Sequence, residues 1–208
     1  MGSKVAILAF SDGNLTEALR ADPGPDAPVE ELVRRAFPGY DVRRDPTEDS
    51  SLLDTYPPVD VTYATVRPAA SVLLDRRLAF DYPTQLDPHL LELGAGRRTI
   101  LFGLHSVVDW LGFAVWDDGV LVRALSLSPD DGVLEDIGER YDFEGPFWAG
   151  EHPVPPDPDE GDYPLPFHPI ELGDGAMRML FGFGVQELDG DLDALAVRVQ
   201  GFRVVPPA

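Results

Sequence analysis

Hydrophobic residues recur along the chain in short runs separated by turn-forming residues. The first run, Lys4–Phe10, is continuously apolar after its lysine, which is typical of a strand buried on both faces at the centre of a sheet. Two further runs, 59–66 and 70–75, flank Arg67-Pro68 and predict a hairpin. Strands are also predicted at Tyr40–Asp45 and Val197–Val205, and 46–58 is predicted to be a polar loop.

A meander of antiparallel strands is predicted in the middle of the chain. Strands at Val107–Trp116 and Val120–Ser128 flank Asp117-Asp118-Gly119, a strong hairpin signal. A strand at Thr99–Leu104 precedes them, and Val133–Ile137 follows the turn Asp130-Asp131-Gly132. Because these strands follow one another through short turns, they are expected to pair as neighbours.

The predicted helices are few and short. Asn14 stands in N-cap position with Glu17 three residues later, a capping box. Asp87 precedes Pro88 and Gly94 follows Leu93, the asymmetry expected of a helix over His89–Leu93. Two more helices are predicted at Val29–Phe37 and around Asp174–Phe183. The fold class is therefore α+β with a mainly antiparallel sheet, as one domain over 1–208 with a strand-and-helix half (1–96) and a second half (97–208).

The segment Gly145–Pro169 breaks this pattern, because it contains eight prolines. Proline fixes φ and lacks an amide donor, so we expect a long irregular loop here and no regular helix. Aromatic residues near both ends predict anchored ends, and the acidic middle, Asp157–Asp162, is expected to be exposed.

Charge excludes some partners. Against 37 acidic residues the 208-residue chain has 16 basic ones, a net charge of −21, which disfavours nucleic acid and anionic membranes. Many aspartates occupy turns, so the charge supports a basic protein partner only weakly. There is no cysteine, and the apolar stretch 99–116 is interrupted by His105 and Asp109. With no secretion signal or membrane span in view, we expect a cytoplasmic protein.

Two groups of residues are candidates for catalysis. In the first, Asp109 could orient His105 and Ser106 could act as a nucleophile, although neighbours in one strand point to opposite faces. In the second, Glu151-His152 and His168 bracket the proline-rich segment and could form an acid–base pair or a metal site. Acidic residues near the second group in sequence are Glu135, Asp136 and Glu139.

Metal and cofactor motifs are incomplete. Asp189, Asp191 and Asp193 have the alternation of a calcium loop, but Ala194 stands where glycine must make the turn and Gln200 where a glutamate should close the site. No phosphate-binding glycine loop is visible, so we expect no cofactor.

Aromatic residues supply the candidate binding surface. A pocket lined by tryptophan and floored by His105 or His152 would suit a small apolar or cationic ligand. The residues assigned to binding are Trp110, Phe147, Trp148, Tyr163, Phe167 and His168.

Several motifs resemble one known group of sequences. They are the opening Met1-Gly2-Ser3-Lys4 and the segments 105–110, 125–130, 135–139, 147–153 and 163–169. Together they resemble an uncharacterised domain family of high-GC actinobacteria. The resemblance implies a soluble bacterial domain, and it implies no activity, cofactor or partner.

Three functional hypotheses follow. The first is a non-catalytic binding protein that contacts a partner, such as a basic protein, through the aromatic proline-rich segment. The second is a hydrolase or metal-assisted enzyme that uses His105, Asp109, Glu151, His152 and His168. The third is a small-ligand sensor, which predicts an enclosed aromatic pocket with few charges. The distances among these side chains separate the three hypotheses.

Overall fold

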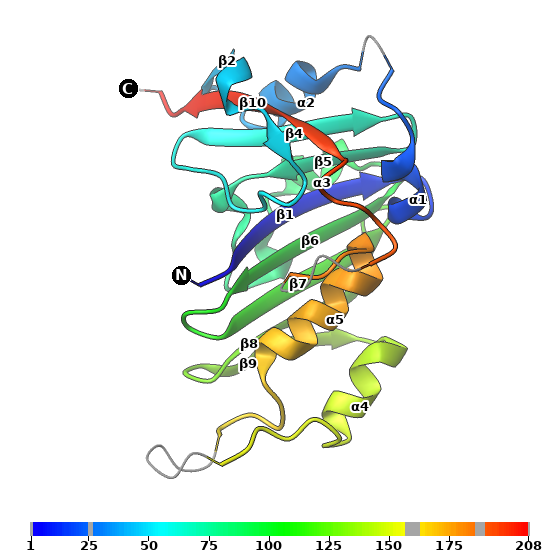
Figure 1. The fold of residues 1–208 in the computed structure, drawn as a ribbon, viewed down its shortest axis with the longest axis vertical. Coiled ribbons are helices and arrows are strands. Elements are labelled where there is room, and N and C mark those ends of the chain that lie inside the picture. The colour runs from blue at the N-terminus through cyan, green and yellow to red at the C-terminus, as the bar shows by residue number, and fades with distance from the viewer. Residues whose placement is uncertain (1, 25–26, 157–162, 186–189, 208) are drawn as a thin grey trace.

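One antiparallel sheet organises the molecule. The computed structural model describes residues 2–24, 27–156, 163–185 and 190–207. Ten strands form a sheet in the order β2-β10-β4-β5-β1-β6-β7-β8-β9, with β3 paired to β10 beside this path (Figure 1). The strands are β1 (Lys4–Ser11), β2 (Asp41–Arg44), β3 (Ser50–Ser51), β4 (Val61–Arg67), β5 (Ala70–Leu74), β6 (Arg98–His105), β7 (Trp110–Asp117), β8 (Val120–Ser128), β9 (Gly132–Gly138) and β10 (Arg198–Val205).

The first strand lies at the centre, as its apolar run predicts. β1 pairs with β5 on one side and β6 on the other, so that Ile7 is opposite both Leu74 and Phe102. Ile7 points into the hydrophobic cluster on one face of the sheet, and its neighbour Leu8 points into the cluster on the other face. Because β1 has no polar face, both of its sides must be covered by other elements.

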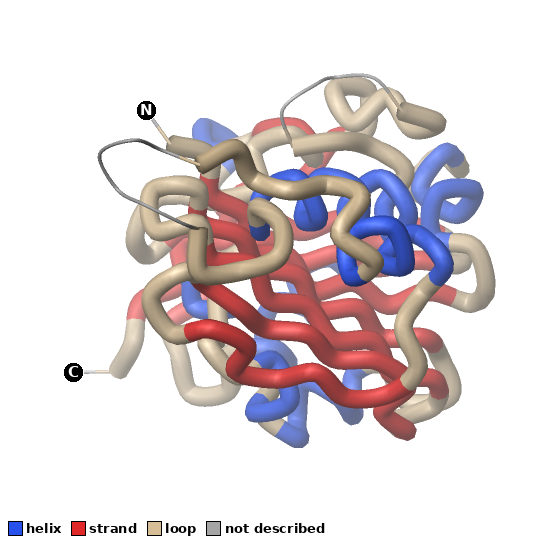
Figure 2. Tube along the Cα trace, turned by 90° about the horizontal axis from the view of Figure 1, so that it is seen from below, coloured by secondary structure: helices blue, strands red, loops and turns tan. Residues whose placement is uncertain are grey.

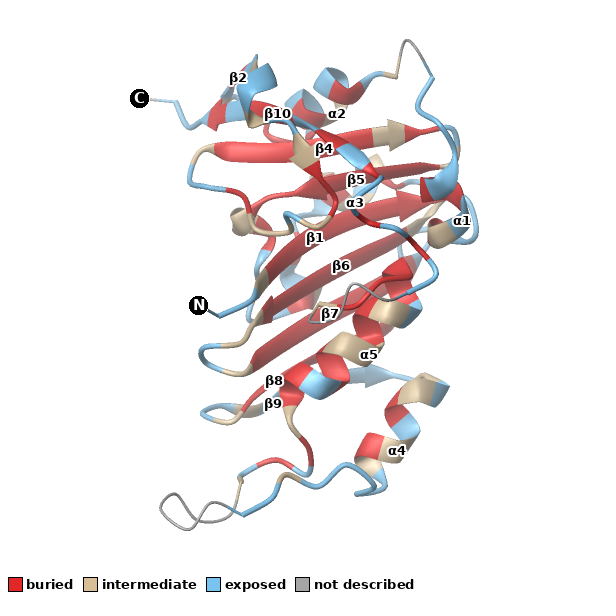
Figure 3. Ribbon diagram, viewed as in Figure 1, coloured by how far each residue is buried: buried red, intermediate tan, exposed pale blue. Residues whose placement is uncertain are grey.

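Helices cover both faces of the sheet (Figure 2). One face packs against α1 (Leu15–Arg20), α4 (Gly145–Trp148) and α5 (Pro169–Phe181), and the other against α2 (Val29–Ala36) and α3 (Pro88–Leu93). Colouring by exposure shows the strands buried between these layers (Figure 3). The single-turn 3₁₀ helices are η1 (Pro46–Glu48), η2 (Arg76–Leu78), η3 (Pro83–Gln85) and η4 (Asp142–Glu144).

The α+β class and the antiparallel meander are confirmed. Asp118 (φ +48°) and Gly119 (φ +74°) form the turn between β7 and β8, which is the backbone that an Asp-Gly hairpin requires. The side chain of Asn14 accepts a hydrogen bond from the Glu17 amide at 3.0 Å, so the predicted cap of α1 is present. The cap of α3 is also present, with Asp87 Oδ1 accepting from the His89 amide at 3.4 Å.

The structure corrects two predictions, the start of one strand of the meander and the loop at 46–58. The strand predicted from Val107 begins at Trp110, because residues 106–109 form the turn between β6 and β7. The loop predicted at 46–58 contains η1 and the two-residue strand β3, which pairs with β10. A two-residue strand has too few positions to show an alternating pattern in the sequence.

The proline-rich segment also differs from the prediction. Pro146 lies in the first turn of α4, where the missing amide costs no hydrogen bond, so a helical turn forms at the start of 145–169. Pro169 plays the same part in α5, which begins there rather than near Asp174. The helix ends at Phe181, because Gly182 takes a left-handed φ of +82°. The predicted exposure of 157–162 concerns residues outside those described.

Candidate functional site

Two of the predicted site residues flank the turn between β6 and β7, one on each side. His105 ends β6 and Trp110 begins β7, and the two residues are paired across the strands. Asp109, the last residue of the turn, has a φ of +48°, a backbone conformation that aspartate tolerates better than most residues. The turn therefore brings His105, Asp109 and Trp110 to one end of the sheet.

The Trp110 indole packs against the backbone of two glycines. Gly103 and Gly112 face each other across β6 and β7. A Cβ atom on Gly103 would lie 2.5 Å from Trp110 Cη2, and one on Gly112 would lie 2.6 Å from Cζ2. Only glycine at both positions lets the ring lie this close to the backbone.

Hydrogen bonds fix the orientation of the same ring. The Trp110 Nε1–H donates to Ser126 Oγ at 3.1 Å, and Ser126 Oγ–H donates to the carbonyl oxygen of Asp81 at 2.7 Å. This chain ties β7 to β8 and to the segment between η2 and η3. The indole is therefore held on one side by glycine backbone and at its nitrogen by a serine.

A cavity of about 310 Å³ opens beside Trp110. Its lining joins four segments that are distant in sequence: the end of β6 with the following turn, the end of β8 with its turn, the η2–η3 connection and the loop before β4. The lining residues are Tyr56, Ala79, Asp81, Leu104, His105, Val108, Trp110, Ser128, Asp130 and Asp131. A cavity of this size can hold a small organic molecule.

One nitrogen of the His105 imidazole is engaged, and the other makes no hydrogen bond to a described residue. His105 Nδ1 accepts a hydrogen bond from the Val107 amide at 3.3 Å. A neutral imidazole that accepts at Nδ1 carries its proton at Nε2. His105 is therefore a donor toward a ligand in the cavity.

The carboxylates give the cavity its charge. Asp81, Asp130 and Asp131 are exposed at its rim. Asp131 Oδ2 accepts from Ser128 Oγ at 2.8 Å, and the Asp131 amide donates back to Ser128 Oγ at 3.1 Å, which closes the β8–β9 turn. Three carboxylates around an aromatic wall favour a cation.

Tyr56 contributes a wall but its ring already contacts cations of the protein. Lys4 Nζ lies 5.5 Å and Arg76 Cζ 5.0 Å from the ring centroid. We therefore assign recognition of a ligand's charge to the carboxylates and to Trp110 rather than to Tyr56.

Asp109 is not among the residues that line this cavity, and its carboxylate contacts His168 instead. His168 Nε2 lies 3.5 Å from Asp109 Oδ2, while His168 Nδ1 accepts from the Ile170 amide at 3.2 Å and caps α5. In an acid–base triad one imidazole nitrogen faces the carboxylate and the other faces the nucleophile. Here the second nitrogen is engaged by the backbone of α5, so the pair has the geometry of a structural contact.

Tyr163 completes this contact. Its ring stacks on His168 with centroids 5.6 Å apart and an interplanar angle of 13°. Burial, with a smaller contribution from the Asp109 carboxylate, raises the pKa of Tyr163 to about 12. The phenol therefore stays protonated at neutral pH.

The other aromatic residues of 145–169 pack largely inward. Phe167 is fully buried and Phe147 is 9 % exposed. Phe147 stacks on His152 at 4.1 Å, and Trp148 meets Phe167 edge-on at 4.9 Å. These rings anchor the segment, as predicted for its ends, and the half-buried Trp148 and Tyr163 are its more accessible aromatic members. Their role in partner binding stays a prediction.

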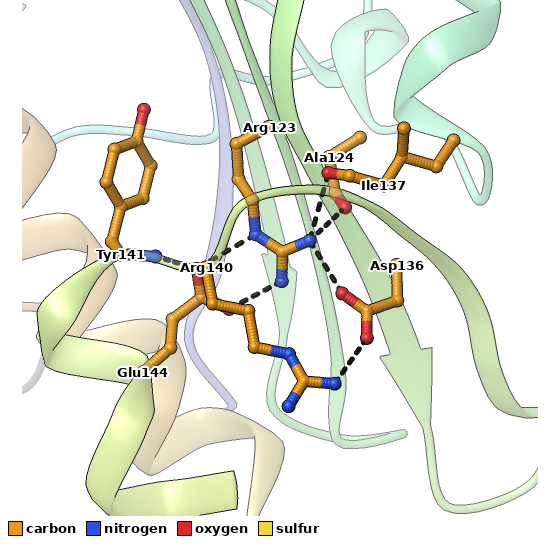
Figure 4. A network of polar contacts seen from close by, with 7 residues as sticks. All are labelled: Arg123, Ala124, Asp136, Ile137, Arg140, Tyr141 and Glu144. Carbon is orange, nitrogen blue, oxygen red and sulfur yellow. Dashed lines mark hydrogen bonds and ion pairs between the residues drawn. The ribbon is translucent and has the colours of Figure 1, made fainter.

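A buried ion pair holds this segment to the sheet (Figure 4). Arg123 of β8 and Glu144 of η4 are both fully buried, with Nε–Oε1 at 2.9 Å and Nη2–Oε2 at 2.5 Å. Arg123 Nη1 also donates to Asp136 Oδ1 at 2.6 Å. Burial disfavours the charged guanidinium, but the two carboxylates outweigh it and raise the pKa of Arg123. The sequence shows no signal for this network.

Other candidates for acid–base chemistry have separate partners. Glu135 accepts from the Thr84 amide at 3.2 Å, and Asp136 bridges Arg123 and Arg140. Glu151 is exposed, and His152 is exposed beside Phe147. Of the five side chains in the enzyme hypothesis, the only contact between two of them is that of Asp109 with His168, counting the described residues.

The predicted calcium loop is only partly described. Asp189 lies outside the described residues, the carbonyl of Asp191 accepts from Arg20, and Asp193 Oδ1 accepts from the Leu195 amide at 3.1 Å. Within the described ranges, no group of three or more metal-binding side chains is close enough to hold an ion.

Sequence reasoning found only His105 and Trp110 among the residues that line the cavity. Tyr56 and Asp81 reach it through long-range folding, and no local pattern marks them. Asp130 and Asp131 carry the turn signal that predicted the end of a strand, and that signal does not distinguish a turn from a ligand site.

These features define an α+β protein with a ten-stranded antiparallel sheet and an acidic, tryptophan-lined cavity at one end of it. Residues 5–202 match a family of unknown function (DUF6928), and the chain belongs to that family. No curated protein and no solved structure matches the chain. In the part of the chain that is described, every helix is too short or too polar to cross a membrane.

Proposed function

We propose that this protein is a non-catalytic binding protein whose ligand is a small organic cation held in the His105–Trp110 cavity. The observation that carries the proposal is the cavity of about 310 Å³ whose lining includes a fixed indole, the His105 imidazole and three aspartates, Asp81, Asp130 and Asp131. This proposal develops the small-ligand sensor hypothesis and differs from it in charge, because that hypothesis predicts few charges whereas three aspartates line this cavity.

Electrostatics favours a cation over a neutral ligand. The carboxylates at the rim attract an ammonium group, and the net charge of −21 raises the local concentration of cations around the whole molecule. The indole offers apolar surface for the rest of the ligand. A hydroxyl or carbonyl oxygen on the ligand would accept a hydrogen bond from His105 Nε2.

A binding role also fits the histidines better than catalysis does. His105 and His168 each accept a backbone amide at Nδ1, so each has a single nitrogen left, and that of His168 faces Asp109. A general base in a triad needs both nitrogens.

Calorimetric titration tests the proposal with three probes. Choline and ethanolamine are small cations at pH 7, and 3,3-dimethylbutan-1-ol has the shape of choline without its charge. We expect at least one cation to bind with a Kd below about 1 mM, which corresponds to about −4 kcal/mol. The neutral alcohol is expected to bind at least tenfold more weakly.

Matched variants locate the binding. Asp81→Asn and Asp130→Asn each remove one exposed carboxylate at the rim and are expected to weaken the cation about threefold to tenfold. Glu139→Gln makes the same charge change at an exposed position outside the cavity lining and is expected to have little effect. Equal binding of the alcohol and the cations, or no binding of either cation, would contradict the proposal.

Binding of a basic protein partner through 145–169 is the second candidate. It is supported by the half-buried rings of Trp148 and Tyr163, which leave aromatic surface of this segment open to a partner. Affinity capture from the host, followed by mass spectrometry, tests it. A basic protein captured by the full chain and lost on deletion of 153–162 is expected, and capture unaffected by the deletion would argue against it. A cytoplasmic location and an actinobacterial origin stay predictions from the sequence.

A further inference from the structure

Arg67 is a buried cation at the edge of a second cavity. It is the last residue of β4, immediately before the turn into β5, and it is 8 % exposed. The cavity has a volume of about 380 Å³ and lies between the end of α1 and the segment 191–197. It shares no lining residue with the cavity at Trp110.

The guanidinium of Arg67 has few hydrogen-bond partners. Its Nη2 donates to the Arg198 carbonyl oxygen at 3.5 Å, and its Nε is buried with no acceptor among the residues that the structure describes. No carboxylate of the described residues forms an ion pair with it. Burial lowers the pKa of Arg67, and the charge of Asp22 partly offsets this effect.

The other strongly buried arginine shows what this chain does when a guanidinium is structural. Arg123 makes ion pairs with Glu144 and Asp136 and donates to two backbone carbonyls. A buried charge without such partners is costly, because its lost hydration is not replaced. Arg67 lacks such partners among the described residues and lines an open cavity. An anion bound in that cavity would supply the missing counter-charge.

The rest of the cavity restricts which anion fits. Its walls are apolar, with Leu19, Leu192 and Val197, and its rim carries Arg20 and the exposed Asp22, Asp191 and Asp193. A purely anionic ligand would meet those three carboxylates. A ligand with a carboxylate at Arg67 and an ammonium group at the rim satisfies both charges.

We propose that the Arg67 cavity binds a small ammonium carboxylate of the α-amino acid class. The planar guanidinium receives the carboxylate through paired hydrogen bonds, and the rim aspartates receive the ammonium group. The apolar walls receive the side chain. This site is independent of the cation site at Trp110, and either can fail without the other.

The test titrates the ¹⁵N-labelled protein with each of the twenty common L-α-amino acids and follows backbone amide shifts by NMR. We expect at least one of them to bind saturably and to shift the amides of Arg67, of 19–22 and of 191–197. The deaminated and the decarboxylated analogues of the best ligand are each expected to bind at least tenfold more weakly.

Variants separate a ligand role from a structural one. Arg67→Met keeps the length of the side chain without the charge, and Arg67→Lys keeps the charge without the planar fork. Both are expected to weaken binding at least tenfold, whereas Arg198→Met, at a neighbouring exposed arginine, leaves it within twofold. In the absence of ligand, Arg67→Met is expected to raise the melting temperature, since it removes a poorly paired buried charge.

Three results would overturn the proposal. They are the absence of binding by all twenty amino acids, an affinity unchanged in Arg67→Met and Arg67→Lys, and inorganic phosphate binding at these amides more tightly than any amino acid. If Arg67→Met fails to fold, the affinity of the Arg67→Lys variant alone decides whether the proposal holds.

Discussion

Arg123 and Glu144 form a two-hydrogen-bond ion pair in which both side chains are completely buried. The pair joins strand β8 to the turn that precedes α4, and Glu144 also accepts from the Tyr141 amide at 3.0 Å (Figure 4). The start of the proline-rich segment is thus attached to the sheet by a polar contact inside the protein. Phe147 and Phe167 of this segment then join the buried hydrophobic cluster that α5 and the sheet form.

Removal of one partner of this pair is expected to be strongly destabilising. Arg123→Met leaves the Glu144 carboxylate buried without its counter-charge, and we expect the free energy of unfolding to fall by about 3–5 kcal/mol. Urea denaturation followed by circular dichroism measures it. The double variant Arg123→Met/Glu144→Leu, which leaves neither charge buried, is expected to recover most of the loss. A loss below about 1 kcal/mol in the single variant would show that the pair is not held as described.

The meander and the caps could be predicted from sequence because their signals are local. Asp118-Gly119 makes its own turn, and Asn14 caps the amide of Glu17 three residues away. The start of α5 was missed, because Pro169 reads as a helix breaker unless His168 is recognised as the cap before it. The strand β3 was missed because its pairing with β10 is set by residues distant in sequence.

The residues of the candidate site likewise divide into those with a local sequence signal and those that only long-range folding brings in. His105 and Trp110 could be predicted because they stand close together in sequence on paired strands. Asp81 and Tyr56 come from separate segments, so only the folded chain places them beside Trp110. Arg67 has no distinguishing neighbour in sequence, and only its burial without a carboxylate sets it apart.

Tyr163 is expected to titrate late. Burial and the Asp109 carboxylate raise its pKa from 10.0 to about 12. The folded state therefore keeps a proton that the unfolded state loses, and this contribution to stability, complete below pH 10, disappears as the pH rises from about 10 to about 12. The ¹³Cζ shift of Tyr163 as a function of pH measures the pKa. Asp109→Asn is expected to bring it closer to 10, and an unchanged value would remove Asp109 from the account.

Gly112→Ala is expected to displace the Trp110 indole. The new Cβ would lie 2.6 Å from the ring, so the ring must move or the strands must separate. We expect a loss of about 1–3 kcal/mol in the free energy of unfolding, typical of overpacking, together with a loss of cation binding. The matched control is Gly145→Ala, because a Cβ at that position would meet no neighbour within 4 Å. Gly119→Ala is unsuitable as a control, because Gly119 has a φ of +74° that alanine rarely adopts. Cation binding that survives Gly112→Ala unchanged would separate the indole from the site.

The most direct test of the central claim is an NMR titration that follows the Trp110 indole N–H and the amides of the β6–β7 and β8–β9 turns. As choline or ethanolamine is added, these signals are expected to shift together along one saturable curve, and to stay in place when 3,3-dimethylbutan-1-ol is added at the same concentrations. Indole and turn signals that do not move with either cation, or that move equally with the neutral alcohol, would contradict a cation site at Trp110.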